Sequence, residues 1–151
     1  MELRVVCVVF GGDGDPDEVK RSITKKLPGS LVQTVDSQAA ANGAYVEMIA
    51  AQTLHAEGTG SQLAKKLEVD FLLRLARTTQ ISRAIEQVGA KKGRPFLLVI
   101  AGPERQLAEV EPDVYGHGFG FGGGKKLGKR QLSSDELDKI ESAALLNVEK
   151  A

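Results

Sequence analysis

Two apolar runs, each about as long as a β-strand, limit the folds open to this chain more than any other feature of its sequence. Residues 3–10 form a Val-rich run that ends at two glycines, and residues 95–102 form a second run, PFLLVIAG. Continuous apolar runs of this length, bounded by turn residues, predict buried strands. Both are much shorter than the roughly 20 apolar residues that a membrane-spanning helix needs. The sequence therefore predicts a sheet in a protein core and no contact with a membrane.

The segments around these runs predict helices and further strands. A proline suited to the first turn, acids near the start and two lysines near the end predict a short helix at 16–27. Ser61 can begin a helix at 62–66, and apolar residues at helical spacing predict two helices in succession up to residue 88. The other expectations are strands at 31–35 and 143–148, helices at 39–57 and 135–142, and an irregular stretch at 103–132.

The order of these elements favours one α+β domain over a doubly wound fold. A chain of 151 residues suits a single domain, which at this size buries roughly 70% of the surface that its unfolded form exposes. We expect residues 1–151 to form a small mixed, largely antiparallel β-sheet covered by several helices. Residues 116–130, rich in Gly and Lys, are expected to form a flexible basic loop.

The single cysteine, Cys7, cannot form an internal disulfide. It lies within the apolar run at 3–10, where a free thiol behaves as a small buried hydrophobe. A reactive thiol needs an exposed, electropositive site, so we expect Cys7 in the core and the protein in a reducing compartment. The first run also lacks the basic leader and the cleavage site of a signal peptide, which favours a cytoplasmic location.

No set of residues in the sequence predicts catalysis, a metal site or a cofactor. The two histidines, His55 and His117, lie far apart, and the sequence contains no HExxH motif, no GxSxG elbow and no pair of cysteines. Residues 116–126 contain a GxGxxG pattern. A dinucleotide-binding loop must follow a strand and open a helix, and the sequence around this segment predicts neither. A nucleotide-binding enzyme that uses this segment stays an alternative.

The charged residues are unevenly distributed although the formal net charge is zero. Residues 65–105 contain nine Lys or Arg against four acids, whereas residues 1–64 contain five against eight. A basic stretch in a neutral protein is either a solvated face or a site for a negatively charged partner.

Four groups of residues between positions 62 and 102 form a further pattern: LAK at 63–65 followed by Leu67, VDFLL at 69–73, QI at 80–81 with Ala84, Ile85 and Gly89, and LVIAG at 98–102. In residue type and spacing this stretch, about a quarter of the chain, resembles the family of kinase-binding small subunits of the KEOPS complex (the PRPK-binding protein, or TPRKB, family) in its archaeal form. The chain departs from the family at Thr79, where the family has Arg. Arg77 lies two positions earlier, which on a helix is a rotation of roughly 200°.

The resemblance implies a non-catalytic subunit of the complex that installs threonylcarbamoyl on the adenosine beside the anticodon of tRNA. Such a subunit docks on the small atypical kinase of the complex, and through it joins the tRNA-modifying ATPase subunit. Archaeal members also hold the CCA tail of tRNA. The resemblance therefore implies an accessory binding subunit without a cofactor, and not an enzyme.

In this interpretation basic side chains neutralise phosphates, Gln80 hydrogen-bonds an exposed base edge, and Ile81 packs against the face of a base. Because aromatic residues are few, stacking on aromatic rings is not expected to dominate. The opposite interpretation places Ile81, Ile85 and Val88 in the core and leaves the basic residues as a solvated face. The residues expected to contact RNA are Lys65, Lys66, Arg74, Arg77, Gln80, Ile81, Arg83, Lys91 and Lys92.

Candidates for docking on the kinase are Leu137, Ile140 and Leu145, in the helix and strand expected near the C-terminus. A short C-terminal helix can present an apolar ridge to a partner. The alternative is that these residues seal the sheet. For the chain as a whole, a purely structural dimerising domain that contacts no RNA is a further alternative.

Overall fold

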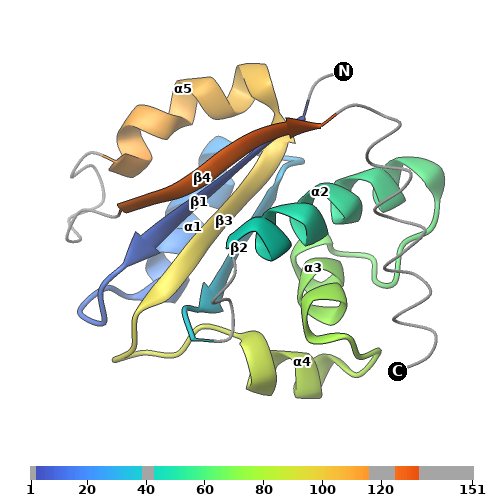
Figure 1. The fold of residues 1–151 in the computed structure, drawn as a ribbon, viewed down its shortest axis with the longest axis horizontal. Coiled ribbons are helices and arrows are strands. Elements are labelled where there is room, and N and C mark those ends of the chain that lie inside the picture. The colour runs from blue at the N-terminus through green and yellow to red at the C-terminus, as the bar shows by residue number, and fades with distance from the viewer. Residues whose placement is uncertain (1–2, 39–42, 116–124, 133–151) are drawn as a thin grey trace.

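The computed structural model describes residues 3–38, 43–115 and 125–132 of the chain, and its centre is a four-stranded β-sheet (Figure 1). Neighbouring strands are antiparallel at every pairing, so the sheet that we expected to be mixed is antiparallel throughout the described strands. Its order is β2-β3-β1-β4. The strands are β1 (Leu3–Phe10), β2 (Leu31–Asp36), β3 (Phe96–Pro103) and β4 (Lys125–Leu132).

The connections between strands define the topology. β1 and β2 run in the same direction with β3 between them, and β3 and β4 likewise flank β1. Two interlocked units of this kind make a split βαβ, or ferredoxin-like, arrangement. The helices are α1 (Pro16–Lys26) between β1 and β2, α2 (Gly43–Thr59), α3 (Leu67–Ala76) and α4 (Ile81–Val88) between β2 and β3, and α5 (Glu104–Tyr115) between β3 and β4.

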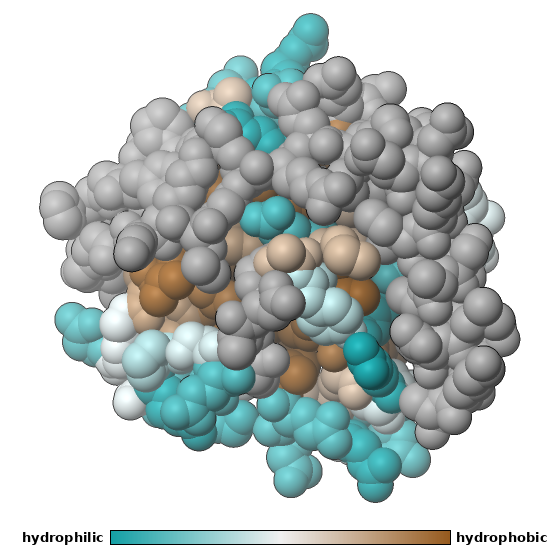
Figure 2. Space-filling view, viewed as in Figure 1, coloured by the Kyte–Doolittle hydropathy of each residue, from teal (hydrophilic) through white to brown (hydrophobic). Residues whose placement is uncertain are grey.

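The helices cover both faces of the sheet, which gives the fold three layers (Figure 1). α1 and α5 pack on one face, where Ile23 and Leu107 are buried. α2, α3 and α4 pack on the other, where Ile49 and Phe71 are buried. Hydrophilic side chains line the lower margin of the molecule, and apolar atoms lie farther in (Figure 2). β1 and β3 are apolar along almost their whole length because both of their faces are buried, and the predicted α+β domain is confirmed.

Cys7 lies in this core with no exposed surface, as predicted. Burial, and to a smaller extent the charge of Glu47, raises the pKa of the Cys7 thiol to about 12. The thiol is therefore protonated at neutral pH and is a poor nucleophile.

The local signals at α1 are also confirmed. Asp15 is the N-cap, and its carboxylate accepts a hydrogen bond from the amide of Asp17 at 3.0 Å. Pro16 occupies the first turn, where its missing N–H costs nothing, and Lys25 and Lys26 lie in the last turn, near the negative end of the helix dipole.

Two elements lie where the sequence predicted irregular chain. Among the side chains of α5 that the structure describes, residues 104–110, Leu107 and Val110 pack on the sheet, and these two alone do not produce a recognisable helical period. β4 begins at Lys125, so the loop expected at 116–130 cannot extend past residue 124. Its basic sequence has little β-propensity, and its pairing with β1 along the whole strand is what makes it a strand.

Other expectations differ in their bounds or cannot be compared. Residues 62–66 were expected to be helical, but α3 begins only at Leu67. The rest of the Gly-rich loop, the helix at 135–142 and the strand at 143–148 lie outside the described residues. Among the described helices, none is both long and apolar enough to cross a membrane.

Candidate nucleic-acid interface

The segment that leads into α3, residues 61–66, is held in place by a buried ion pair. Arg74 Nε donates to Asp70 Oδ1 one turn earlier on α3, and neither side chain is exposed. One further atom of each residue in the pair holds the segment. Arg74 Nη2 donates to the carbonyl oxygen of Ser61 at 2.8 Å, and Asp70 Oδ2 accepts from the amide of Leu63 at 2.9 Å.

The structure corrects the role expected for Arg74. The residue is only 1% exposed, and Asp70 and the 61–66 segment use its guanidinium, so it cannot reach a phosphate. The spacing of four residues from Asp70, typical of a helical ion pair, was the signal for this role. Lys65 and Lys66, at the end of the segment, are exposed, as a phosphate contact requires. Arg74 therefore supports the backbone that presents these lysines.

Arg77 ends α3 in an unusual backbone conformation and lies over an aromatic ring. Its φ of 58° is in the left-handed region, which costs a residue with a side chain roughly 1–2 kcal/mol. The guanidinium carbon lies 5.6 Å from the centre of the Tyr45 ring, and Nε donates to the Tyr45 hydroxyl oxygen at 3.3 Å. This hydrogen bond raises the pKa of Arg77 above its ordinary value, so the exposed guanidinium carries its charge at all physiological pH values.

Tyr45 is a site residue that the sequence did not reveal. In the sequence it is one residue within the helix expected at 39–57. The packing of α2 against α3 brings its ring under Arg77. No local feature of the sequence predicts the contact between Tyr45 and Arg77, because the two residues are far apart along the chain.

The start of α4 exposes one polar and two apolar side chains. Gln80, at the N-cap position, is exposed and its side chain makes no capping hydrogen bond. Ile81 and Ile85 are 49% and 52% exposed, whereas Ala84 and Val88 are buried. The opposite interpretation was therefore wrong for the two isoleucines and correct for Val88.

Arg83 is exposed and lies on the side of α4 opposite Ile81, because two residues along a helix are a rotation of about 200°. It lies one turn after Gln80. Gln80 and Arg83 thus share one flank of the helix, and Ile81 and Ile85 form the other.

Lys91 and Lys92, in the loop between α4 and β3, differ in their surroundings. Lys91 Nζ donates to the carbonyl oxygens of Glu86 at 3.0 Å and Gly89 at 3.3 Å, and so caps the C-terminal end of α4. Lys92 Nζ lies 4.0 Å from Asp15 Oδ2, and its side chain is 76% exposed. Lys91 stabilises a helix end, while Lys92 remains accessible to a phosphate.

Six of the candidate residues form two groups at opposite ends of α3. Lys65 and Lys66, which we call the α3 start pair, precede the helix. Tyr45, Arg77, Gln80 and Ile81, which we call the α3 end cluster, lie at its other end. The ten residues of α3 separate the two groups by about 15 Å at 1.5 Å per residue. The residues predicted to contact RNA therefore do not come together in a single binding site.

The remaining predicted sites fall largely outside the described residues. Leu137, Ile140 and Leu145 lie there, as does the Gly-rich segment at 116–124. Its neighbours are described: α5 precedes it and β4 follows it. Phosphate-binding Gly loops follow a strand and open a helix, so that helix amides face the phosphate, and the order here is the reverse. Within the described part of the chain, no group of three or more His, Cys, Asp or Glu side chains could hold a metal ion.

No protein-family model matches this chain, and no curated protein matches it either. The function proposed below therefore rests on the resemblance of residues 62–102 and on the geometry of the α3 end cluster.

Proposed function

We propose that this chain is a non-catalytic subunit of a cytoplasmic KEOPS-type complex, where it binds the CCA tail of tRNA and the small atypical kinase. The resemblance of residues 62–102 motivates the assignment to the complex that makes threonylcarbamoyladenosine. One observation carries the RNA-binding half of the proposal: the exposed guanidinium of Arg77 lies over the Tyr45 ring, three residues before the free side chain of Gln80.

Each group of the α3 end cluster suits one part of an unpaired nucleotide. A guanidinium plane stacks on the face of a base, and Arg77 is already held by Tyr45, so less side-chain entropy is lost on binding. Gln80 offers both a donor and an acceptor to a base edge. Ile81 adds apolar surface for a second base or a ribose. Stacking on a guanidinium plane does not depend on aromatic residues, so their small number does not weaken this contact.

The sharpest test of RNA binding compares intact tRNA with tRNA that lacks its CCA tail in a filter-binding assay. We expect wild type to bind the intact tRNA at least about tenfold more tightly, because the tail carries the stacked bases. Arg77→Ala should lose most of that difference. Arg105→Ala, which removes an exposed arginine from α5 on the other face of the sheet, is the matched control and should behave as wild type. Equal affinity of wild type for both RNAs rejects this half of the proposal.

The protein-binding half is tested separately. In the proposal the kinase docks on Leu137, Ile140 and Leu145, and the tRNA-modifying ATPase is reached only through the kinase. Native co-purification from the source cell should recover both partners, and Leu137→Asp/Ile140→Asp should abolish their recovery without changing tRNA affinity. Recovery of neither partner with the wild-type chain rejects membership of the complex, whatever the RNA result.

A purely structural dimerising domain is the second candidate, and the exposed isoleucines of α4 favour it. Ile81 and Ile85 are adjacent on one side of the helix, where a second copy of the chain could cover them. This candidate predicts a concentration-dependent dimer in analytical ultracentrifugation that Ile81→Ser/Ile85→Ser dissociates. A monomer at all concentrations rejects it.

A nucleotide-binding enzyme that uses residues 116–126 is less well supported, because the segment lies between a helix and a strand in the wrong order for a phosphate loop. Calorimetric titration with ATP, NAD and GTP tests it. Absence of heat at millimolar ligand rejects it.

A further inference from the structure

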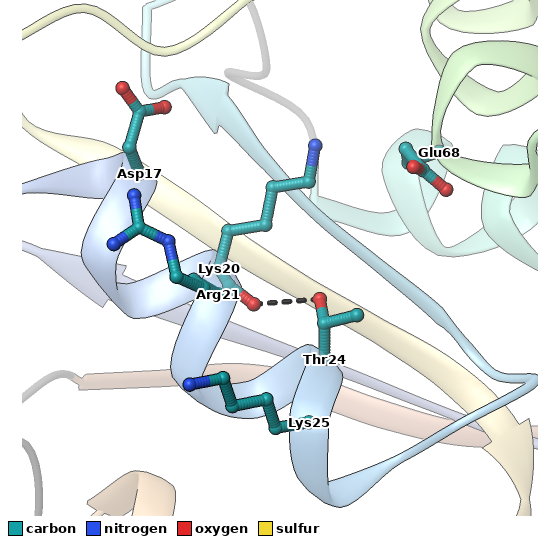
Figure 3. A pocket seen from close by; sticks show the side chains of 6 residues that line it. All are labelled: Asp17, Lys20, Arg21, Thr24, Lys25 and Glu68. Atoms are coloured by element: carbon teal, nitrogen blue, oxygen red, sulfur yellow. Dashed lines mark hydrogen bonds between the residues drawn. The ribbon is translucent and has the colours of Figure 1, made fainter.

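A charged hollow lies beside the sheet, away from the α3 end cluster. Its volume is about 450 Å³, and it lies between α1 and the first turn of α3 (Figure 3). Three of the side chains that line it are cations, two are carboxylates and one is a hydroxyl. They are Lys20, Arg21, Lys25, Asp17, Glu68 and Thr24.

The chemistry of the lining suits a sugar–phosphate backbone and not a base. Lys20 and Arg21 are neighbours on one turn of α1, and Lys25 lies about one turn later (Figure 3), so the three cations can contact neighbouring phosphates. Thr24 Oγ1 already donates to the carbonyl oxygen of Lys20 at 2.7 Å, so the cations are the main donors left for a ligand. Among the residues that the structure describes, those lining the hollow are polar or charged, and none of them has an aromatic ring on which a base could stack. Glu68 can accept a hydrogen bond from a ribose 2′-hydroxyl.

The hollow is next to the α3 start pair. Lys65 and Lys66 immediately precede α3, and Glu68 belongs to its first turn. Gln33 of β2 donates from Nε2 to the carbonyl oxygen of Glu68 at 2.9 Å, which ties this turn to the edge of the sheet. The start pair therefore adds two positive charges immediately before the turn of α3 that carries Glu68.

The β2 edge does not favour a peptide strand as the occupant. The amide of Thr34 donates to Gln33 Oε1 at 2.9 Å, which uses one of the groups that an added strand would need. Val35 forms a β-bridge with Gly89, which blocks the far end of the same edge. Main-chain hydrogen bonds are the main source of affinity in strand addition, so these contacts disfavour it and leave the charged hollow as the feature that selects a ligand.

We propose that this hollow, extended by Lys65 and Lys66, binds the backbone of a double-stranded RNA stem. The proposal rests on the proposed function: the stem belongs to the same RNA whose unpaired 3′ end lies at the α3 end cluster. Duplex RNA is recognised mainly through its phosphates and 2′-hydroxyls, which are the groups that this lining fits. A stem at one end of α3 and a single strand at the other would account for the separation of the two groups.

The test uses two RNAs and two triple variants of the full chain. One RNA is a hairpin stem that ends in a single-stranded CCA; the other is the same 3′ strand without its complement. Lys20→Ala/Arg21→Ala/Lys25→Ala removes the cations of α1, and Lys20→Arg/Arg21→Lys/Lys25→Arg keeps their charge as the matched control. We expect the alanine variant to lose about tenfold in affinity for the hairpin and to lower the slope of log affinity against log salt by about 2–3. Its affinity for the single strand should not change.

Each outcome decides between the proposals. Unchanged hairpin affinity, or equal losses on both RNAs, overturns the stem site and leaves the binding of the CCA tail intact. Failure of wild type to bind either RNA overturns the stem site and the RNA-binding function together. Loss of kinase recovery with unchanged RNA affinity overturns the stem site in favour of an acidic protein surface. Arg21→Glu alone, at an exposed position, repeats the comparison should the triple variant unfold.

Discussion

The two ends of α3 both present positive charge, but they hold it in different ways. At the start, Lys65 and Lys66 lie on a backbone segment fixed by the buried Asp70–Arg74 pair, and their own side chains are long, exposed and flexible. At the end, the charged side chain itself is fixed, because Arg77 lies over Tyr45 and is hydrogen-bonded to its hydroxyl group.

This difference between the two ends of α3 suits two kinds of RNA recognition, one of the backbone and one of a base. Mobile lysines on a fixed backbone follow a phosphate chain without regard to its sequence, and their contribution falls with salt. A fixed guanidinium beside a free amide selects the geometry of a base. We therefore expect the start of α3 to govern the salt dependence of RNA binding, and the end of α3 to govern the preference for an unpaired tail.

The largest expected effect is a loss of stability, from a substitution that removes the buried ion pair at the start of α3. Arg74→Ala leaves Asp70 as a buried charge without its partner and should lower the free energy of unfolding by about 3–5 kcal/mol. Urea denaturation measures this value. Arg105→Ala, at an exposed arginine of α5, should change it by less than about 0.5 kcal/mol. A loss below about 1 kcal/mol in Arg74→Ala would show that the pair does not support the segment.

The next effect concerns Arg77 and is expected to separate stability from binding. Arg77→Gly relieves the left-handed backbone strain, because glycine adopts a positive φ without cost. The variant should be as stable as wild type or more stable, by up to about 1 kcal/mol. Its affinity for tRNA with a CCA tail should nevertheless fall about tenfold or more, since the base loses the guanidinium plane on which it stacks.

Tyr45→Leu provides the matched control for that result. It keeps the apolar contact of α2 with its neighbours and removes the ring and hydroxyl that hold Arg77. A smaller loss of tail affinity is expected than in Arg77→Gly, because the guanidinium remains but is no longer held. Full affinity in both variants would show that the α3 end cluster does not contact the tail.

A smaller effect is expected at the lysines. Lys65→Ala/Lys66→Ala should leave the unfolding free energy unchanged, because both side chains are exposed. It should lower the salt slope of tRNA binding by about 1–2 without altering the ratio of affinities for tRNA with and without the tail. A change in that ratio would mean that the two ends of α3 act as one site.

The last effect concerns Cys7, in the core of the protein, and it is absent at neutral pH and develops as the pH rises past about 9. Because folding raises the pKa of Cys7 from 9.0 to about 12, the neutral thiol is favoured in the folded state. Its contribution is complete below about pH 9 and is lost as the pH rises toward 12. Wild type should therefore lose about 1 kcal/mol more stability than Cys7→Ala between about pH 8 and pH 10. Equal losses in urea denaturation would contradict the burial of the thiol.

The sequence predicted a helix or strand correctly where its formation depends on residues that are close together along the chain. The apolar runs of β1 and β3 and the proline, acids and lysines of α1 predicted those elements, because each depends on neighbours along the chain. The expected α+β domain followed from their order. Within the candidate site, the exposed positions of Lys65, Lys66 and Gln80 agreed with the sequence.

Only the tertiary structure decided the rest, because the deciding contacts join residues far apart in the chain. β4 is a strand through its pairing with β1, and α5 packs on the sheet, where Leu107 and Val110 are buried. The spacing of Arg74 from Asp70 allowed an ion pair, but its burial depends on the contact with the 61–66 segment. Tyr45 became a site residue only when α2 packed on α3. The sequence determines where the charged and apolar residues lie along the chain. Which of the charged side chains remain exposed to solvent depends on how the helices and strands pack.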